Sequence, residues 1–326
     1  MREPGTRPDR FDVTTFGEAV IRLSVPAGQR METASGFDID VSGTEANVVG
    51  ALSRLGRRCG WVSALPESPL GRRVQNKFRG HGIDLSAVSW RPEGRIATYF
   101  VEFAHAPRPV RIHYDRKDSC FTRMRPEDID WDYLLNSRHL HLTGLSVPLG
   151  AKTGEIIERA LRLAKSRGVT TSIDVNYRSL LWTTEEARAR LMPLVGGVDL
   201  LMCSLRDAKS VFGCEGPAEG TALQLAELTG AANIVLTLER EGVIAFDGSR
   251  LHREAARPVK IVDRIGAGDA MAAGVLHGWL QDSLQAGLRY GSVMAALALS
   301  QFGDAVVTHP GELDRILGDS TPDIQR

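Results

Sequence analysis

The stretch Asp263–Gly274 reads DRIGAGDAMAAG, and it is the most informative segment of the chain. It places two glycines around an alanine, then an aspartate, then a run of small residues typical of a closely packed helix. Backbone N–H groups at the start of a helix bind anions, and the helix dipole adds about half a positive charge there. Gly266 and Gly268 let the backbone approach a phosphate closely. The segment therefore predicts a phosphate site at a helix N-terminus.

Asp269, in the first turn of that predicted helix, is the candidate catalytic base. A carboxylate beside a phosphate site can take the proton from an attacking hydroxyl, which contributes about 10²–10⁴-fold to the rate. Gly266, Ala267 and Gly268 are the predicted anion hole, whose amides would stabilise charge on a transferred phosphoryl group. This pattern alone is a weak signal, because many strand-to-helix turns need glycines for steric reasons. The rest of the chain has to support it.

The second half of the chain alternates between strand and helix patterns. The apolar spacing predicts strands over 139–142, 170–175, 200–203 and 233–237. It predicts helices over 152–167, 185–192, 222–228, 270–279 and 284–300, the second of them ending before Pro193. Such alternation indicates a mostly parallel sheet with helices on both faces. We therefore expect a three-layer α/β/α sandwich.

The first half adds a second feature. We predict a first strand over 12–23, a helix over 44–55, a strand over 59–65 and a helix over 70–81. Ala97–Phe103 and Val110–Tyr114 then alternate like a hairpin around the loop His105–Pro109. This hairpin interrupts the strand–helix rhythm. We interpret residues 1–326 as one domain, with a small β lid built from about 20–43 and 95–116.

Composition excludes several classes of function. Forty Lys and Arg balance forty Asp and Glu among 326 residues, so no charge excess points to nucleic acid or to a membrane surface. The polar start has two prolines and lacks the apolar centre of a secretory signal. The four scattered cysteines have no metal-ligand spacing. His139 and His141 share one strand face without further ligands, which favours a structural role. We expect a cytoplasmic enzyme.

Asp263–Gly274 resembles the D-T-x-G-A-G-D signature of the ribokinase-like (PfkB) carbohydrate kinases, and the resemblance covers nearly the whole chain. The early Gly-Gly…Asn segment of the family, which closes on the sugar, is similar to 42–47 (SGTEAN). Its N-x-x-E segment, near the magnesium-bound phosphates, is similar to 204–207 (SLRD). Its T-x-G-x-x-G turn is similar to 237–242 (TLEREG). The resemblance implies ATP and Mg²⁺ as cofactors, and it leaves a monovalent cation open.

Within the family, the chain most resembles 2-keto-3-deoxygluconate kinases. Tyr99, the segment Tyr114-Asp115-Arg116 and the segment 174–178 (DVNYR) carry this likeness. An anionic substrate needs fixed positive partners, and the planar guanidinium of arginine matches a carboxylate. The resemblance implies a sugar-acid site formed by these residues: Gly43, Asn47, Tyr99, Tyr114, Arg116 and Arg178. Separately from the resemblance, the predicted hairpin leaves an open strand edge and an apolar face, so we expect a homo-oligomer through the lid.

The nucleotide side departs from the family pattern. The resemblance implies nucleotide contacts from Asn176, Ser204, Thr237, Gly242, Arg264 and Ser292, and an Mg²⁺ contact from Asp207 through water or phosphate. However, Ser42 replaces a glycine, Asp207 a glutamate, Glu239 a glycine and Ser292 a frequent asparagine. Arg264 stands where Thr or Pro is common. We expect the charges of Glu239 and Arg264 to offset each other's effect on the polyphosphate, either as a direct ion pair or as opposed contributions to the same electrostatic field.

Three other readings remain open at this point. A ribokinase-like enzyme for a neutral sugar or a nucleoside would not need Arg116 or Arg178. A catalytically weak, sugar-binding relative fits the changes on the nucleotide side, but not the intact GAGD. An NAD-dependent dehydrogenase shares the α/β rhythm, but no GxGxxG follows the first predicted strand.

Overall fold

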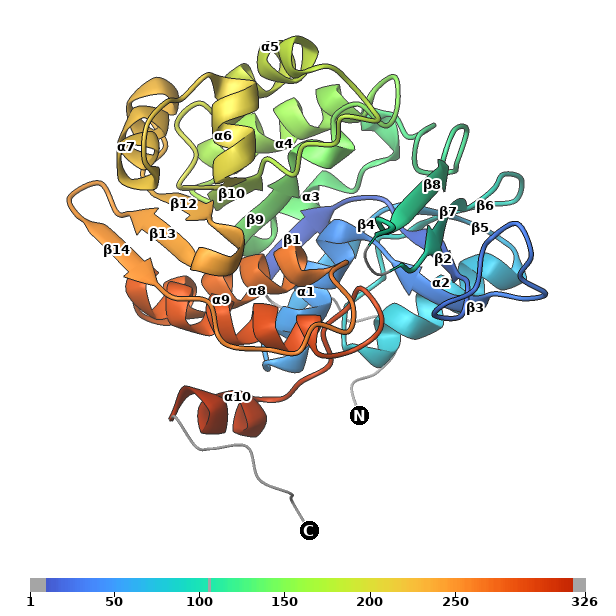
Figure 1. The fold of residues 1–326 in the computed structure, drawn as a ribbon. Helices are drawn as coiled ribbons and strands as arrows, with labels where there is room; N and C mark the ends of the chain where they lie inside the picture. Colours follow the sequence, from blue (N-terminus) through green and yellow to red (C-terminus); the bar gives the residue numbers. More distant parts are fainter. Residues whose placement is uncertain (1–9, 105–106, 319–326) are drawn as a thin grey trace.

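The computed structural model describes residues 10–104 and 107–318. The predicted polar start, up to residue 9, and the first two residues of the predicted loop His105–Pro109 lie outside the described residues. Figure 1 shows a layered α/β body with a small sheet at one side.

The centre of the body is an eight-stranded sheet with the order β14-β13-β12-β11-β10-β9-β1-β4. Its strands are β1 (Phe11–Phe16), β4 (Cys59–Val62), β9 (Ser137–Thr143), β10 (Thr170–Asp174), β11 (Leu200–Ser204), β12 (Ile234–Thr237), β13 (Val243–Phe246) and β14 (Leu251–Glu254). The six strands from β4 to β12 pair in parallel, and β13 and β14 add an antiparallel edge. Successive apolar residues point to opposite faces, so the sheet has a core on each side.

Helices cover both faces (Figure 1). One layer holds α3 (Trp131–Leu135), α4 (Thr153–Ser166), α5 (Thr184–Val195), α6 (Leu205–Phe212) and α7 (Ala218–Thr229). The other holds α1 (Thr44–Arg54), α8 (Ala267–Gln281) and α9 (Leu284–Leu299), and α2 (Pro69–Gly80) and α10 (Pro310–Leu317) share its core. In α8 and α9, glycines let the backbones meet: a Cβ at Gly274 would lie 2.6 Å from Gly291 Cα.

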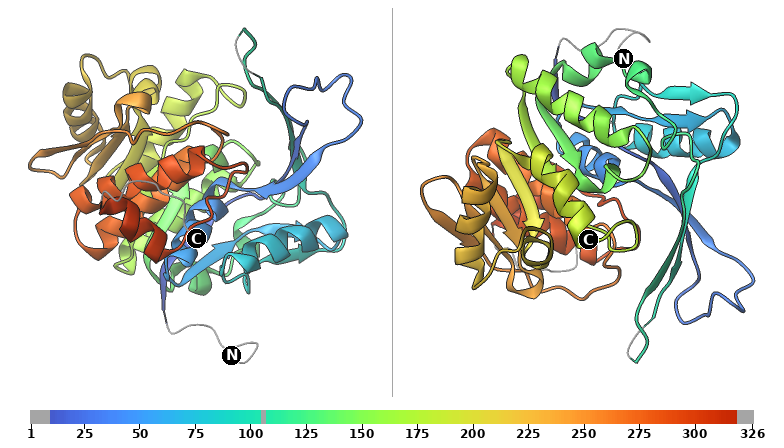
Figure 2. Two further views of the ribbon diagram at one scale, coloured as in Figure 1. Left: turned by 60° about the horizontal axis from the view of Figure 1, so that its bottom comes forward. Right: turned by 90° about the horizontal axis from the view of Figure 1, so that it is seen from above.

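A second, four-stranded sheet with the order β3-β2-β7-β8 lies beside the body, and we call it the small sheet. Its strands are β2 (Val20–Ser24), β3 (Asp38–Ser42), β7 (Ala97–Glu102) and β8 (Arg111–Asp115). The pair β2–β7 is parallel, while β2–β3 and β7–β8 are antiparallel. Figure 2 shows the two chain segments, from far apart in the sequence, extending together away from the body. Two further strands, β5 (Ala64–Pro66) and β6 (Ser89–Arg91), pair with each other.

The predicted fold class is confirmed, and several element boundaries are wrong. The predicted strand 12–23 is two strands in different sheets, because the chain leaves the central sheet at Gly17, where a Cβ would overlap Glu45. The predicted strand 59–65 is likewise split, at Ser63. The helix predicted to end before Pro193 continues through it to Val195, since a proline near a helix C-terminus removes only one hydrogen bond. Helices α3, α6 and α10 and the antiparallel edge were not predicted.

The structure also bears on the two histidines and the four cysteines. His139 and His141 are buried in β9, where Ser172 Oγ lies 2.7 Å from His139 Nε2 and 2.8 Å from His141 Nδ1. Burial lowers the pKa of both imidazoles to about 3. All four cysteines are buried free thiols. These groups belong to the core, as predicted for the histidines.

Candidate active site

A cleft of about 1570 Å³ opens where the carboxyl ends of β10, β11 and β12 face the start of α8 and the small sheet. Ligands of open α/β sheets bind at this edge. The predicted site residues that line it are Gly43, Tyr99, Tyr114, Arg116, Asn176, Arg178, Ser204, Asp207, Thr237, Gly242, Arg264, Gly266, Ala267, Gly268 and Asp269. Asn47 and Ser292, both described residues, do not line it. The fold thus brings fifteen of the seventeen predicted residues together.

The start of α8 forms one wall of the cleft. Gly266 precedes the helix with a φ of 86°, and a Cβ there would lie 1.9 Å from the carbonyl oxygen of Asp304. Only glycine fits this position. Gly268 differs, because no described atom lies within 4 Å of where its Cβ would be. Gly266 is therefore required by the fold, while Gly268 leaves open space beside the free amides of the first helical turn.

Asp269 lies in that first turn and is buried. Its Oδ2 accepts a hydrogen bond from Asn47 Nδ2 at 2.8 Å. Burial raises the pKa of the Asp269 carboxyl well above its usual range, and the Asn47 hydrogen bond partly opposes this shift. Asn47 thus fixes one carboxylate oxygen of Asp269, and its contact with the sugar stays a prediction.

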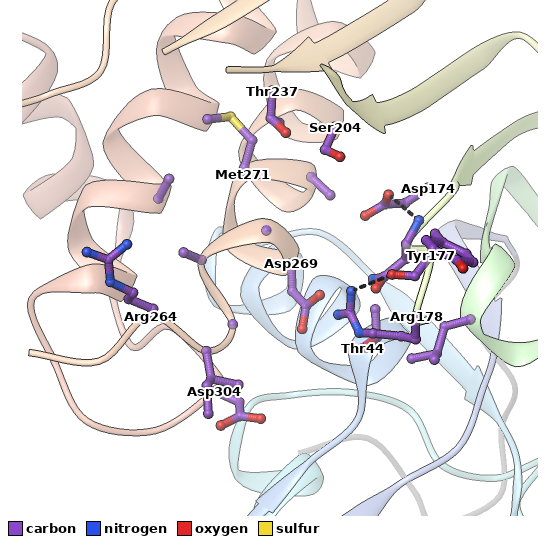
Figure 3. A pocket seen from close by; sticks show the side chains of 18 of the residues that line it. Thr44, Asp174, Tyr177, Arg178, Ser204, Thr237, Arg264, Asp269, Met271 and Asp304 are labelled. Carbon is purple, nitrogen blue, oxygen red and sulfur yellow. Dashed lines mark hydrogen bonds between the residues drawn. The ribbon is translucent and has the colours of Figure 1, made fainter. Parts of the chain in front are cut away.

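Arg178 lies across the cleft from Asp269, and Figure 3 shows the two side chains pointing into the same space. It follows β10 after a turn in which Asn176 has a φ of 42° and donates its backbone N–H to Asp174 Oδ1 at 3.1 Å. Arg178 is exposed, and no carboxylate of the described residues forms an ion pair with it. Burial raises the pKa of Asp174 to about 7, and the positive charge of Arg178 opposes that shift.

Arg116, the other predicted carboxylate ligand, already has a carboxylate partner. Its Nε and Nη2 donate to Glu18 Oε2 at 2.9 and 2.7 Å. Glu18 is buried and also accepts from Ser119 Oγ. The ring of Tyr114 lies 5.4 Å from the Arg116 guanidinium carbon, within cation–π range. Arg116 lines the cleft, but much of its charge is balanced by Glu18.

Tyr99 lines the cleft, and its hydroxyl is bonded to Asp304, which lines the same cleft. It is buried, and its OH donates to Asp304 Oδ2 at 2.5 Å. The rings of Tyr99 and Tyr114 are 5.8 Å apart across the paired strands β7 and β8. The sequence did not indicate that the hydroxyl would be engaged by a carboxylate two hundred residues away.

The predicted nucleotide residues surround the other end of the cleft. Ser204 caps α6 by accepting the Asp207 N–H at 3.0 Å, and Thr237 ends β12. Gly242 has a φ of 101°, and a Cβ there would lie 2.1 Å from Glu254 O, so the fold requires glycine. Ser292 is buried in α9 and donates to Ala255 O at 2.9 Å. It supports the wall without reaching the cleft.

Glu239 and Arg264 lie in the same cleft but not against each other. Glu239 has a φ of 54°, a left-handed conformation that favours glycine, as the family pattern implies. Both are described residues, and no ion pair joins them. The predicted direct ion pair is therefore absent, which leaves only the interaction through the field of the cleft.

The carboxylates at this edge suit a magnesium ion held mainly by phosphates. Asp207 is buried at the start of α6, and Arg206 Nε lies 3.5 Å from Asp207 Oδ1. The negative charge of Asp207 contributes to the raised pKa of Asp174. Within the described ranges, no group of three or more His, Cys, Asp or Glu side chains is arranged to hold a metal. Mg²⁺ commonly takes one or two carboxylates together with substrate phosphates and water, so the residues fit such an ion.

Residues 10–309 of the chain match the pfkB family carbohydrate kinases. The chain belongs to this family. Among its relatives, a 2-dehydro-3-deoxygalactonokinase of Haloferax volcanii is 35% identical over 316 residues, covering 97% of this chain and 99% of the relative. A 2-dehydro-3-deoxygluconokinase of Thermoproteus tenax is 31% identical, covering 80% of each chain. The crystal structure of 2-dehydro-3-deoxygluconokinase from Thermotoga maritima aligns with a TM-score of 0.89 and 33% identity over 95% of this chain and 98% of that one.

Family membership makes the chain a phosphotransferase that acts on a sugar hydroxyl. The cleft also contains a buried acidic residue that was not predicted from the sequence. Glu45 lines the cleft fully buried, and its Oε1 accepts from Thr143 and Ser146 hydroxyls at 2.5 Å each. An acidic residue in a first helical turn is so common that it gave no signal. Among the described residues, no helix is long and apolar enough to span a bilayer.

Proposed function

We propose that this carbohydrate kinase transfers the γ-phosphoryl group of ATP to a hydroxyl of a 2-keto-3-deoxy sugar acid, the class that the names of its relatives call 2-dehydro-3-deoxy aldonates. One observation carries the proposal: a buried carboxylate, Asp269, faces an exposed guanidinium, Arg178, that has no ion-pair partner among the described residues. The carboxylate suits a reacting hydroxyl, and the guanidinium suits the acid group at the other end of one small molecule.

Asp269 acts as the base in this proposal. The substrate oxygen attacks the γ-phosphorus, an O–P bond forms, the bond to the β-phosphate oxygen breaks and ADP leaves. The hydroxyl proton passes to Asp269 Oδ1, because Oδ2 is held by Asn47. The amides of Gly266–Gly268 donate to the equatorial oxygens of the transferred group, where charge develops.

The nucleotide lies along the other end of the cleft. The apolar side chains of Val259, Ile261 and Leu299 line it there and suit an adenine ring, while Thr237 and Gly242 bound the same space. Asp207, with Asp174 nearby, would hold Mg²⁺ through water or phosphate. Bound there, the ion would neutralise charge on the β- and γ-phosphates. Whether K⁺ also contributes is tested by replacing it with tetramethylammonium in the assay.

The small sheet serves as a lid in this proposal. Tyr99, Ile112 and Tyr114 of the small sheet line the same cleft as Arg178, so a bound sugar acid would lie between sheet and body. Closure of such an element excludes water and suppresses hydrolysis of ATP. Because the reaction consumes ATP, we place it in the cytoplasm.

An assay of ADP release by the purified protein tests the function. We expect turnover with 2-keto-3-deoxygluconate, 2-keto-3-deoxygalactonate or both, since these acids differ at one carbon. Turnover only with neutral sugars or nucleosides would replace the proposal by the neutral-substrate kinase. Binding of a sugar acid without turnover would favour the catalytically weak relative.

We propose that a second copy of the chain covers the outer part of the small sheet. Phe37, Ile39 and Val110 there are each more than a third exposed, and such apolar positions on a short sheet favour pairing with another subunit. Light scattering at micromolar concentration should give at least twice the mass of 35.6 kDa. Changing Ile39→Lys should lower that mass, and a monomeric parent protein would contradict the proposal.

A further inference from the structure

Arg22, in the middle of β2, is a buried arginine with a partner for each of its three nitrogens. It is 2% exposed. Its Nη2 donates to Asp263 Oδ2 at 2.6 Å, its Nη1 donates to Asp304 Oδ1, and its Nε donates to Ser24 Oγ at 2.9 Å. Burying a guanidinium is costly unless its donors are satisfied and its charge is balanced. Two carboxylates from distant parts of the chain meet both conditions.

Those two carboxylates belong to the loops that flank the anion-hole turn. Asp263 begins the segment that leads into Gly266, and its Oδ1 accepts the Ile265 N–H at 3.0 Å. Asp304 lies in the loop after α9, and its carbonyl oxygen packs so closely on Gly266 that no Cβ fits between them. Figure 3 shows Asp304 beside the start of α8. A shift of either loop would therefore move the amides of Gly266–Gly268.

The small sheet holds the loop of Asp304 through two further contacts. Ser42 Oγ, at the end of β3, and Tyr99 OH, on β7, both donate to Asp304 Oδ2. Between β14, which ends at Glu254, and α8, which begins at Ala267, the described chain contains no helix or strand. The position of the turn thus depends on contacts from outside its own segment, and Arg22 reaches both flanking loops.

We propose that Arg22 is a positioning residue for phosphoryl transfer, which fixes the anion-hole amides relative to the small sheet. This inference rests on the proposed function. Displacing a catalytic group by about 1 Å can lower the rate by about 10²-fold. Because Arg22 does not line the cleft, it acts on the transition state through Asp263 and Asp304 rather than by touching substrate.

Kinetics of Arg22→Lys and Arg22→Ala test the proposal. Lysine keeps the charge but cannot reach both carboxylates with a planar fork. We expect kcat to fall about 10- to 100-fold in both variants, with KM for the sugar acid changed less than threefold. Arg95→Ala is the matched control, because both Arg95 Nη atoms donate to a single carboxylate, that of Asp115, at an exposed site beside the small sheet. Its kcat should equal that of the parent.

Chemical rescue separates positioning from a general loss of stability. Millimolar guanidinium chloride should restore part of kcat in Arg22→Ala, since the ion can occupy the space between the two carboxylates. The same concentration of sodium chloride should not, and neither salt should change Arg95→Ala. A folded Arg22→Lys variant with kcat within twofold of the parent would overturn the proposal, as would loss of activity accompanied by an equal rise in KM.

Hydrogen–deuterium exchange tests the same inference without using activity. Backbone amides of 263–269 and 302–305 should exchange at least about tenfold faster in Arg22→Lys than in the parent or in Arg95→Ala. If the parent phosphorylates no sugar acid, the proposed function fails, and this exchange still decides whether Arg22 holds the turn. Unchanged exchange in both segments would overturn the positioning role.

Discussion

The two walls of the cleft are built in different ways. The α8 wall consists of four consecutive residues, 266–269, which offer backbone amides and one carboxylate. The small-sheet wall consists of side chains from separate segments, and two of its polar groups are bonded to carboxylates: Tyr99 to Asp304 and Arg116 to Glu18. The first wall is local in the sequence, and the second exists only in the folded chain.

Because of this difference, substitutions in the two walls should have different effects on catalysis and on stability. A change in the α8 wall alters groups that contact the transferred phosphoryl group directly. A change in the small-sheet wall removes one partner from a buried pair, so its cost includes a carboxylate left unpaired. We therefore expect kinetic effects from the first wall, and mixed effects on stability and binding from the second.

The largest expected effect comes from Asp269→Asn. Asparagine keeps the size of the side chain and can still bond Asn47, but it cannot accept the proton. We expect kcat to fall by at least about 10²-fold, while ATP binding measured by calorimetry stays within threefold of the parent. Asp132→Asn, at an exposed residue that does not line the cleft, is a control for a general loss of folding. Near-normal turnover of the Asp269 variant would show that Asp269 is not the catalytic base.

Arg116→Ala should instead act mainly on stability. It leaves Glu18 buried without its cation, which costs about 3 kcal/mol and lowers Tm by roughly 6 °C. The exposed Arg178→Ala should leave Tm within about 1 °C, because such a surface residue contributes little to folding. Thermal unfolding of the two variants side by side checks the contrast. Equal Tm shifts would break the distinction between a paired arginine and an unpaired one.

Asp174 gives a stability effect that depends on pH. Its pKa of about 7 in the folded chain lies above the value of about 3.9 for an unfolded one. The folded state therefore binds this proton more tightly, and its stability falls as pH rises between those two values. Asp174→Asn removes that loss, so without ligands its Tm should exceed the parent's by a few degrees at pH 8. The difference should vanish near pH 4, and a difference independent of pH would contradict this reading.

The smallest effect concerns Glu239 and Arg264 at the nucleotide end. Arg264→Thr should weaken ATP binding, because the carboxylate of Glu239 then repels the polyphosphate unopposed. Glu239→Gly should restore much of the loss and relieve the left-handed backbone strain. A double-mutant cycle on the Kd for ATP should give a coupling of about 1 kcal/mol, which an interaction through the field of the cleft can supply without direct contact. Additive effects would mean that the two side chains act independently.

The α8 wall could be predicted from the sequence much better than the small-sheet wall. The GAGD turn was predictable because its chemistry lies within consecutive residues that the fold keeps together. The alternation of strands and helices predicted the layers, but not the break at Gly17, where one apolar run serves two sheets. The partners of Arg22, Tyr99 and Arg116 were not predictable, since each contact joins residues about 100 to 280 positions apart. A local sequence pattern cannot indicate a contact between residues so far apart in the chain.

Selectivity between acid and neutral substrates is the decisive test of whether Arg178 binds the acid group of the substrate. The ratio of kcat/KM for 2-keto-3-deoxygluconate to that for its analogue with the carboxylate reduced to an alcohol should be measured for the parent and for Arg178→Ala. We predict that the parent prefers the acid, and that Arg178→Ala lowers kcat/KM for the acid by about 2 kcal/mol, roughly 30-fold, with little change for the neutral analogue. Equal losses for both substrates would contradict the account, because Arg178 would then serve the phosphates or the fold rather than the acid group.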